Sequence, residues 1–187
     1  MSSLDKIKFI PLDEYFHAYH VPNFHNTLLT YKDFIIEEFY QKKNNDNNTI
    51  INNTGLKEYL DKHLFFILDK FYISEIYPSY NQYLSYVQDN NHKGDPHFHS
   101  HIKDKVSITS VMYINPPKVG EGGEISLCFT HSNNVKTFQP QEDMIYLFPS
   151  WAFHKPEVQN VETPRICINW GIYSYTKPIH KITGNIW

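Results

Sequence analysis

Apolar residues recur at helical spacing in two stretches of the first third of the chain. In residues 26–42 and again in residues 55–71 they fall three or four positions apart, which is the spacing of an amphipathic helix. A polar, Asn-rich stretch over residues 43–53 separates them and is typical of a solvated loop. Residues 8–22 predict a short strand and a loop that ends at Val21 and Pro22.

The pattern changes to strands after Pro78. Short apolar or alternating runs, bounded by turn residues, follow one another with no helical stretch between them. They cover residues 80–88, 97–101, 106–115, 124–129, 144–148 and 165–175. Gly120 to Gly123 predicts a tight connection between two of these strands. Helices followed by strands predict an α+β, mainly β fold with an antiparallel sandwich or barrel.

The length of the chain predicts one domain. A chain of 187 residues is large enough to bury a single core. We expect helical support over about residues 1–77 and a β core over about residues 78–187.

Composition and charge narrow the class of protein. The net charge of -3 argues against nonspecific binding to nucleic acid or to an anionic membrane. No apolar run reaches the length of a membrane span, and the first residues carry no apolar signal region, so we expect an intracellular, cytoplasmic protein. Cys128 and Cys167 lie in apolar runs and are expected to be buried thiols.

Histidines gather at two places in the β half. His97, His99 and His101 alternate in one predicted strand, so their side chains project from the same face. His154 follows a separate apolar run. Two imidazoles at i and i+2 and a third from a distant strand hold one face of a metal ion and leave other positions open. The alternative is a histidine-rich edge that faces solvent without a metal.

Arg165 opens the last strand-like run, where an arginine is out of place unless it is paired. The guanidinium group suits bidentate binding of a carboxylate. Tyr113 shares a face of its predicted strand with Thr109 and Val111, and its hydroxyl is a second candidate for that carboxylate. The alternatives are an edge-strand arginine in solvent and a plain core or surface tyrosine.

The order of these segments resembles the 2-oxoglutarate- and Fe(II)-dependent oxygenases, above all small prolyl-hydroxylase-like members of bacterial and viral type. Pro96 to His99 resembles the metal segment of that family, Val106 to Asn115 its next strand, and Gly122 to Ile125 its Gly-Gly-Glu turn. Phe148 to His154 resembles its second histidine segment. Arg165 falls where the family places the basic residue that binds the distal carboxylate of 2-oxoglutarate.

The resemblance implies a double-stranded β-helix, or jelly roll, supported by the two helices. It implies a dioxygenase that uses Fe(II), 2-oxoglutarate and O2 to hydroxylate a substrate with release of succinate and CO2. The implied metal ligands are His97, His99 and His154, with His101 as the alternative to His97. Arg165 and Tyr113 would bind 2-oxoglutarate. The substrate is a peptidyl residue by default, or a small molecule; neither a membrane nor a nucleic acid is an expected partner.

Two positions depart from the family pattern. A histidine stands where the family has a carboxylate ligand, which indicates a three-histidine site; Asp95 and Asp104 flank the cluster without the right spacing. Cys167 stands where many members have a serine two residues after the basic residue, which removes one hydrogen bond to 2-oxoglutarate.

The register of the histidine pair stays open at this point. The Pro-His-aromatic order favours His97 with His99, whereas the distance from Gly94 and the short reach to Thr109 favour His99 with His101.

Two rival classes of protein share part of this pattern. A cupin-type metal protein has the jelly roll, the His-x-His pair and a later histidine, but typically adds a glutamate shortly after the pair. Only Asp104 is available here. The second rival is a non-catalytic jelly-roll binding protein with a decayed site.

Overall fold

The computed structural model describes residues 3–12, 15–31, 33–35, 37, 54–71, 84–88, 97–101, 108–129, 134–160 and 165–172. Its helical elements are η1 (Ser3–Lys6), α1 (Phe24–Leu29) and α3 (Thr54–Phe71). Its strands are β1 (Lys8–Pro11), β2 (His17–His20), β3 (Leu84–Gln88), β4 (Ile108–Asn115), β5 (Ile125–Cys128), β6 (Val135–Phe138), β7 (Met144–Pro149), β8 (Phe153–Pro156) and β9 (Arg165–Ile172).

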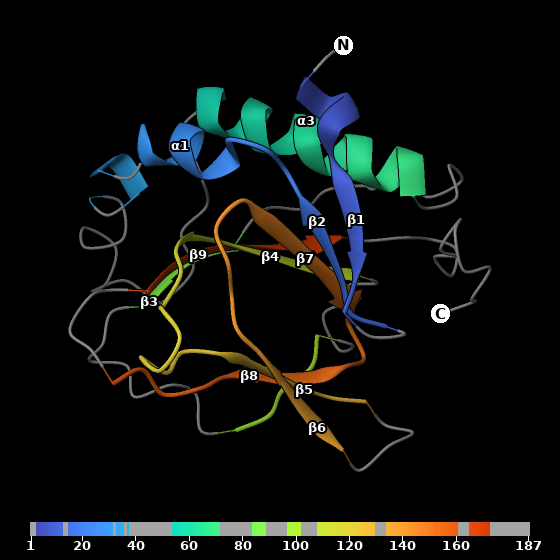
Figure 1. Cartoon of the computed structure of the whole chain (residues 1–187), viewed down its shortest axis with the longest axis vertical. Coiled ribbons are helices and arrows are strands. Elements are labelled where there is room, and N and C mark those ends of the chain that lie inside the picture. Colours follow the sequence, from blue (N-terminus) through green and yellow to red (C-terminus); the bar gives the residue numbers. More distant parts are fainter. Residues whose placement is uncertain are drawn as a thin grey trace.

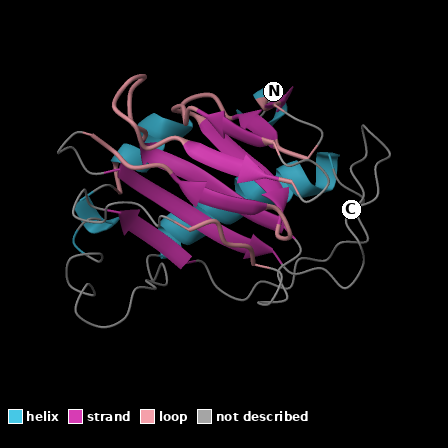
Figure 2. Cartoon of the chain, turned by 90° about the horizontal axis from the view of Figure 1, so that it is seen from below, coloured by secondary structure: helices cyan, strands magenta, loops and turns pink. Residues whose placement is uncertain are grey.

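The strands form two antiparallel sheets that face each other. The larger, six-stranded sheet has the order β1-β2-β7-β4-β9-β3, and the three-stranded sheet has the order β6-β5-β8. Figure 1 shows α1 and α3 lying across one face of the larger sheet, with the smaller sheet against the opposite face. Figure 2, seen from below, shows the strands in front of the helices. This is the arrangement of a double-stranded β-helix with helical support, as predicted.

The larger sheet is buried on both faces. In β4, Met112 and Ile114 belong to the core shared with the helices, whereas Val111 and Tyr113 belong to the core between the sheets. Successive strand residues point to opposite faces, so the central strands β2, β4, β7 and β9 each contribute residues to both cores. This double burial is why these strands appear in the sequence as nearly continuous apolar runs.

The second predicted helix is confirmed as α3. Leu56, Leu60, Leu64 and Ile67 are three or four residues apart and are almost completely buried, so one stripe of the helix packs on the sheet. Lys57 and Asp61 form an ion pair on its partly exposed side. No helix in the described part of the chain is long and apolar enough to cross a membrane.

The first predicted helix begins earlier than expected and is interrupted. The spacing predicts a helix over residues 26–42, whereas α1 spans Phe24–Leu29, turns follow at Thr30 and Tyr31, and the described residues 33–35 and 37 are helical again. The Thr30 hydroxyl donates to the Thr27 carbonyl at 2.6 Å, and such local bonds compete with helix continuation. Residues 38–42 lie outside the described residues.

Several strand predictions need correction. Residues 8–22 hold two strands, β1 and β2, which pair with each other, and β2 also pairs with β7. Residues 97–101 form only an isolated bridge at His99 rather than a strand. Strand β6 was not predicted, because its residues are mostly exposed and carry little apolar pattern. His154, which was predicted to follow a strand, lies within β8. Residues 80–83 of the first predicted strand lie outside the described residues.

The glycine-rich turn before β5 is confirmed and is packed against the segment after β8. Gly120, Gly122 and Gly123 all have positive φ, which residues with a Cβ rarely adopt. Gly123 N–H donates to the Val158 carbonyl at 3.1 Å. A Cβ on Gly122 would lie 2.2 Å from the Val158 carbonyl oxygen, whereas a Cβ on Gly120 would meet nothing within 4 Å.

We therefore expect Gly122→Ala to destabilise the protein more than Gly120→Ala. Gly120→Ala should cost only the strain of a left-handed alanine, about 1–2 kcal/mol. Gly122→Ala adds a collision with backbone that cannot rotate away, and we expect a further loss of roughly 1–3 kcal/mol. Urea unfolding midpoints of the two variants measure the difference. Equal losses would contradict the close packing of Gly122 on Val158.

Candidate metal centre

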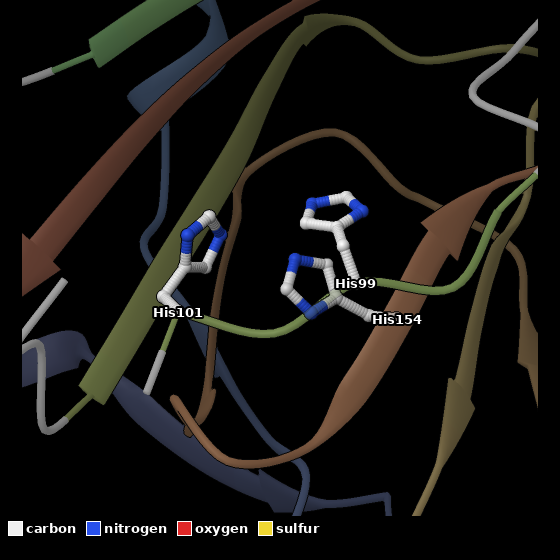
Figure 3. Close-up of side chains that lie close together, drawn as sticks. All are labelled: His99, His101 and His154. Atoms are coloured by element: carbon white, nitrogen blue, oxygen red, sulfur yellow. The ribbon is translucent and has the colours of Figure 1, made fainter. Parts of the chain in front are cut away.

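Three histidine rings from two distant segments lie close together between the sheets. Figure 3 shows His99 and His101 on one segment and His154 on β8, with the rings gathered in one place. Their candidate ligand nitrogen atoms all lie within 4.8 Å of one another. Ring centroids are 4.3 Å apart for His99 and His154, 5.0 Å for His101 and His154, and 5.3 Å for His99 and His101.

Backbone hydrogen bonds hold the two segments together. His99 N–H donates to the His154 carbonyl at 3.0 Å, and His154 N–H donates to the His99 carbonyl at 2.9 Å. His101 N–H donates to the Ser150 carbonyl at 2.9 Å. Because His99 and His101 are two residues apart in this extended pairing, both rings project to the side of His154.

His154 is held as a neutral imidazole. Its ring is buried, and burial is the main reason why its pKa falls from 6.5 to about 3, with His99 and His101 lowering it further against the opposing effect of the Ala152 carbonyl. Nδ1 lies 3.0 Å from the Ala152 carbonyl oxygen. A carbonyl can only accept, so we assign the proton to Nδ1. This leaves the lone pair of Nε2 for a metal.

The group lies where the inter-sheet core meets the surface. The Phe148 ring contacts the His154 ring with centroids 4.8 Å apart, and Phe148 belongs to the inter-sheet core. His99 and His101 are only partly buried. One side of the group is therefore apolar, and the other side is partly exposed.

The structure brings His101 rather than His97 into this group. Of the metal ligands predicted from the sequence, His99 and His154 are in it, and His101 joins them as the alternative that the sequence allowed. His97, the preferred partner, is exposed and is not a member. Two contacts bring residues 99 and 101 to the side of His154: the backbone bridge between His99 and His154, and the hydrogen bond from His101 N–H to the Ser150 carbonyl. Asp95 and Asp104 lie outside the described residues.

The two residues predicted to bind 2-oxoglutarate lie on neighbouring strands. Tyr113 in β4 is buried in the inter-sheet core, where its ring packs edge-on against Tyr146 with centroids 6.2 Å apart. Arg165 is the first residue of β9 and pairs with Gln88 of β3. Tyr113 pairs with Cys167, two residues after Arg165.

Two backbone carbonyls that support the site were not predicted from the sequence. The Ala152 carbonyl orients the His154 ring, and the Ser150 carbonyl holds the His101 segment. No sequence signal could have revealed them, because every residue carries a carbonyl and only the tertiary pairing selects these two.

Comparison with known families identifies the chain. The family model described as the 2OG-Fe(II) oxygenase superfamily matches residues 78–172, which are more than half of the chain and include all three clustered histidines. The chain belongs to this superfamily. Membership confirms the predicted enzyme class and the predicted cofactors, Fe(II), 2-oxoglutarate and O2, at the level of the family, and it does not support the cupin-type alternative. A comparison with curated proteins finds no match.

Solved structures share the fold at low sequence identity. A prolyl-4-hydroxylase from Pseudomonas putida matches with a TM-score of 0.54 and 12% identity over 84% of this chain and 87% of that chain. The viral collagen prolyl hydroxylase of Paramecium Bursaria Chlorella virus-1 matches with a TM-score of 0.54 and 14% identity, over 89% and 97%. A prolyl 4-hydroxylase from Phytophthora capsici matches with a TM-score of 0.53 and 16% identity over 87% of this chain, which spans only 60% of the Phytophthora chain.

The histidine group fits a divalent metal ion of the kind that this family uses. Imidazole suits iron as well as zinc, copper and nickel, and the neutral state of His154 means that an ion need not displace a proton from it. Among the described residues, no carboxylate joins the group.

The depressed pKa of His154 predicts acid sensitivity of the metal-free protein. Its folded pKa of about 3 is below the ordinary value of 6.5, so between these pH values the unfolded chain binds this proton and the folded chain does not. The contribution of His154 to the free energy of unfolding is therefore present above pH 6.5 and is lost as the pH falls towards 3. Urea unfolding in the presence of a chelator across this pH range measures the slope of the free energy of unfolding against pH. We expect a shallower slope in His154→Gln.

The matched control is His97→Gln, which removes an exposed histidine two residues from His99 and should leave the slope unchanged. His63 in α3 has its pKa lowered by burial as well, so the test is the difference between variants rather than the slope of the wild type. An unchanged slope in His154→Gln would contradict the assignment of a buried neutral ring.

Proposed function

We propose that this chain is a 2-oxoglutarate- and Fe(II)-dependent dioxygenase that hydroxylates a residue in a peptide or protein. His99, His101 and His154 would hold the iron, and Arg165 and Tyr113 would bind 2-oxoglutarate. The bound iron and 2-oxoglutarate supply the O2 chemistry of this family, in which the substrate is hydroxylated and 2-oxoglutarate leaves as succinate and CO2.

The convergence of three imidazoles from two distant segments carries the proposal. A histidine-rich edge without a metal would have no reason to aim a buried, neutral ring at two partly buried ones. Protonation would make the three rings repel one another, whereas a shared divalent ion would bind all three lone pairs. Three ligands on one side leave positions for a bidentate acid and for O2.

The register of the sheet supports the assignment of the 2-oxoglutarate residues. Tyr113 and Cys167 are paired and both belong to the inter-sheet core. Residues two apart in a strand share a face, so residue 165 is assigned to the same face of β9 as Cys167. A basic residue there would lie at the far end of the inter-sheet space from Phe148 and the metal.

Similarity of fold supports the proposed substrate class. The similar structures are prolyl hydroxylases, including one that acts on collagen by its description. A peptidyl substrate is therefore the first class to test. A small molecule is the alternative.

Anaerobic titration with Fe(II) and then 2-oxoglutarate tests the proposed function directly. We expect a visible charge-transfer band from the chelated 2-oxo acid in the wild type. Arg165→Ala should weaken 2-oxoglutarate binding by about tenfold to a hundredfold, because it removes a charge-assisted hydrogen bond to a carboxylate, and should leave Fe(II) affinity intact.

Arg165→Lys is the matched variant, since it keeps the charge but loses the bidentate fork, and we expect an intermediate affinity. Metal binding without a band in the wild type would argue against the oxygenase. No metal binding at all would favour a non-catalytic jelly-roll protein.

The ligand assignment predicts which histidine tolerates a carboxylate. His101 is two residues after His99 and takes the place of the family's carboxylate ligand, so His101→Asp should retain Fe(II) binding and rebuild the two-histidine, one-carboxylate set. His99→Asp should lose most Fe(II) affinity, since it removes the leading histidine and leaves a carboxylate where the two-histidine, one-carboxylate set has an imidazole.

Fe(II) affinity can be measured by competition with a colorimetric chelator. His97→Ala is the control and should bind as the wild type does, because His97 is exposed and outside the group. Loss of iron binding in His97→Ala, with retention in His101→Ala, would reverse the ligand assignment.

A further inference from the structure

Thr109 carries a buried hydroxyl that no described residue of the protein satisfies. Thr109 in β4 is 5% exposed, and its Oγ1 has no hydrogen-bond partner among the described residues. Buried hydroxyl groups nearly always have a partner, and leaving one without a partner costs free energy. A residue of this kind in a well-packed strand calls for a bound group that supplies the missing hydrogen bond.

The strand register assigns this hydroxyl to the face on which the metal group lies. Thr109 is two and four residues before Val111 and Tyr113, which belong to the inter-sheet core, so it shares their face of β4. Across the sheet it pairs with Phe148 of β7 and with Gly171 of β9. Phe148 contacts the His154 ring, and Gly171 contributes no side chain beyond its Cα.

The neighbouring residue provides an internal comparison. Ser110 is also buried, and its hydroxyl also has no partner among the described residues. It alternates with Thr109, so it lies on the opposite face of β4, the side of Ile108 and Met112 in the core against the helices. The two hydroxyl groups differ in the face of the sheet and not in burial, and only Thr109 shares a face with the residues around the metal group.

The inner face of β4 runs from the metal end of the site to the Arg165 end. Thr109 pairs across the sheet with Phe148, whose ring contacts His154. Tyr113 pairs with Cys167, which is two residues after Arg165. A dicarboxylate that bridges the metal and Arg165 would lie along this face. Its metal-bound carboxylate would be at the Thr109 end.

We propose that the Thr109 hydroxyl donates a hydrogen bond to the metal-bound carboxylate end of the 2-oxo acid. This inference rests on the proposed function and names a further binding residue for the co-substrate. A hydrogen bond to a charged acceptor in a partly dry site is stronger than one in water, so it would offset the cost of keeping the hydroxyl unsatisfied in the empty protein.

The test compares Thr109→Val, Thr109→Ser and Ser110→Ala with the wild type. Valine has the shape of threonine without the hydroxyl, serine keeps the hydroxyl, and Ser110→Ala removes the matched hydroxyl on the opposite face. The 2-oxoglutarate affinity is measured anaerobically with Fe(II) bound, from the charge-transfer band. We expect about tenfold weaker binding in Thr109→Val, near-normal binding in Thr109→Ser, and unchanged binding in Ser110→Ala.

Two readouts that need no activity separate binding from structure. Fe(II) affinity without 2-oxoglutarate should be unchanged in Thr109→Val. The thermal stability of the metal-free Thr109→Val protein should equal or exceed that of the wild type, since an unsatisfied buried hydroxyl is removed. A less stable variant with normal 2-oxoglutarate affinity would overturn the proposal and indicate a structural partner, such as a bound water.

Failure of this inference is distinguishable from failure of the proposed function. If the wild type binds no 2-oxoglutarate, the oxygenase proposal fails and the Thr109 proposal fails with it. If the wild type binds 2-oxoglutarate and Thr109→Val binds it equally well, only the Thr109 proposal is overturned.

Discussion

The candidate site depends on the pair of reciprocal backbone hydrogen bonds between His99 and His154. Fixing the backbone of a residue costs roughly 1–2 kcal/mol of conformational entropy, and a short segment outside any strand must recover that cost through such contacts. The bridge does so with main-chain groups alone. The pairing therefore uses no imidazole nitrogen, and substituting a ring need not dissolve the pairing that positions it.

Burial of the larger sheet on both faces links the site to the helices. In β7, Phe148 contacts the His154 ring, while its neighbour Leu147 packs into the core shared with α3. Protein interiors are close-packed and transmit strain. A cavity created between the helices and the sheet would therefore disturb the metal group through β7. The N-terminal segment is thus part of the support for the site, both through the helices and through β2, which pairs directly with β7.

The sequence predicted those parts of the protein that leave a local pattern. The stripe of α3, the apolar runs of β4 and β7 and the glycine turn are local, and they were predicted close to their observed bounds. The choice between His97 and His101 was different, because alternation puts both on the face of His99, and it is a tertiary contact, from His101 N–H to the Ser150 carbonyl, that holds His101 beside His154. The environment of the Thr109 hydroxyl could not be predicted from the sequence either, because it depends on cross-strand partners that are far away in sequence.

A three-histidine set changes the charge of the site and not only its donor atoms. Three neutral imidazoles leave the full charge of a divalent ion, whereas a carboxylate ligand would cancel one unit of it. Because 2-oxoglutarate arrives as a dianion, its attraction to the metal is greater at the all-imidazole site, and the partly buried surroundings strengthen that difference. By linkage, the co-substrate must then raise the affinity for the metal by the same factor. Within the proposed function, the two departures from the family pattern thus act in opposite directions on 2-oxoglutarate binding. The loss of the ligand carboxylate strengthens the contact of 2-oxoglutarate with the metal, whereas Cys167 in place of a serine weakens its contact near Arg165.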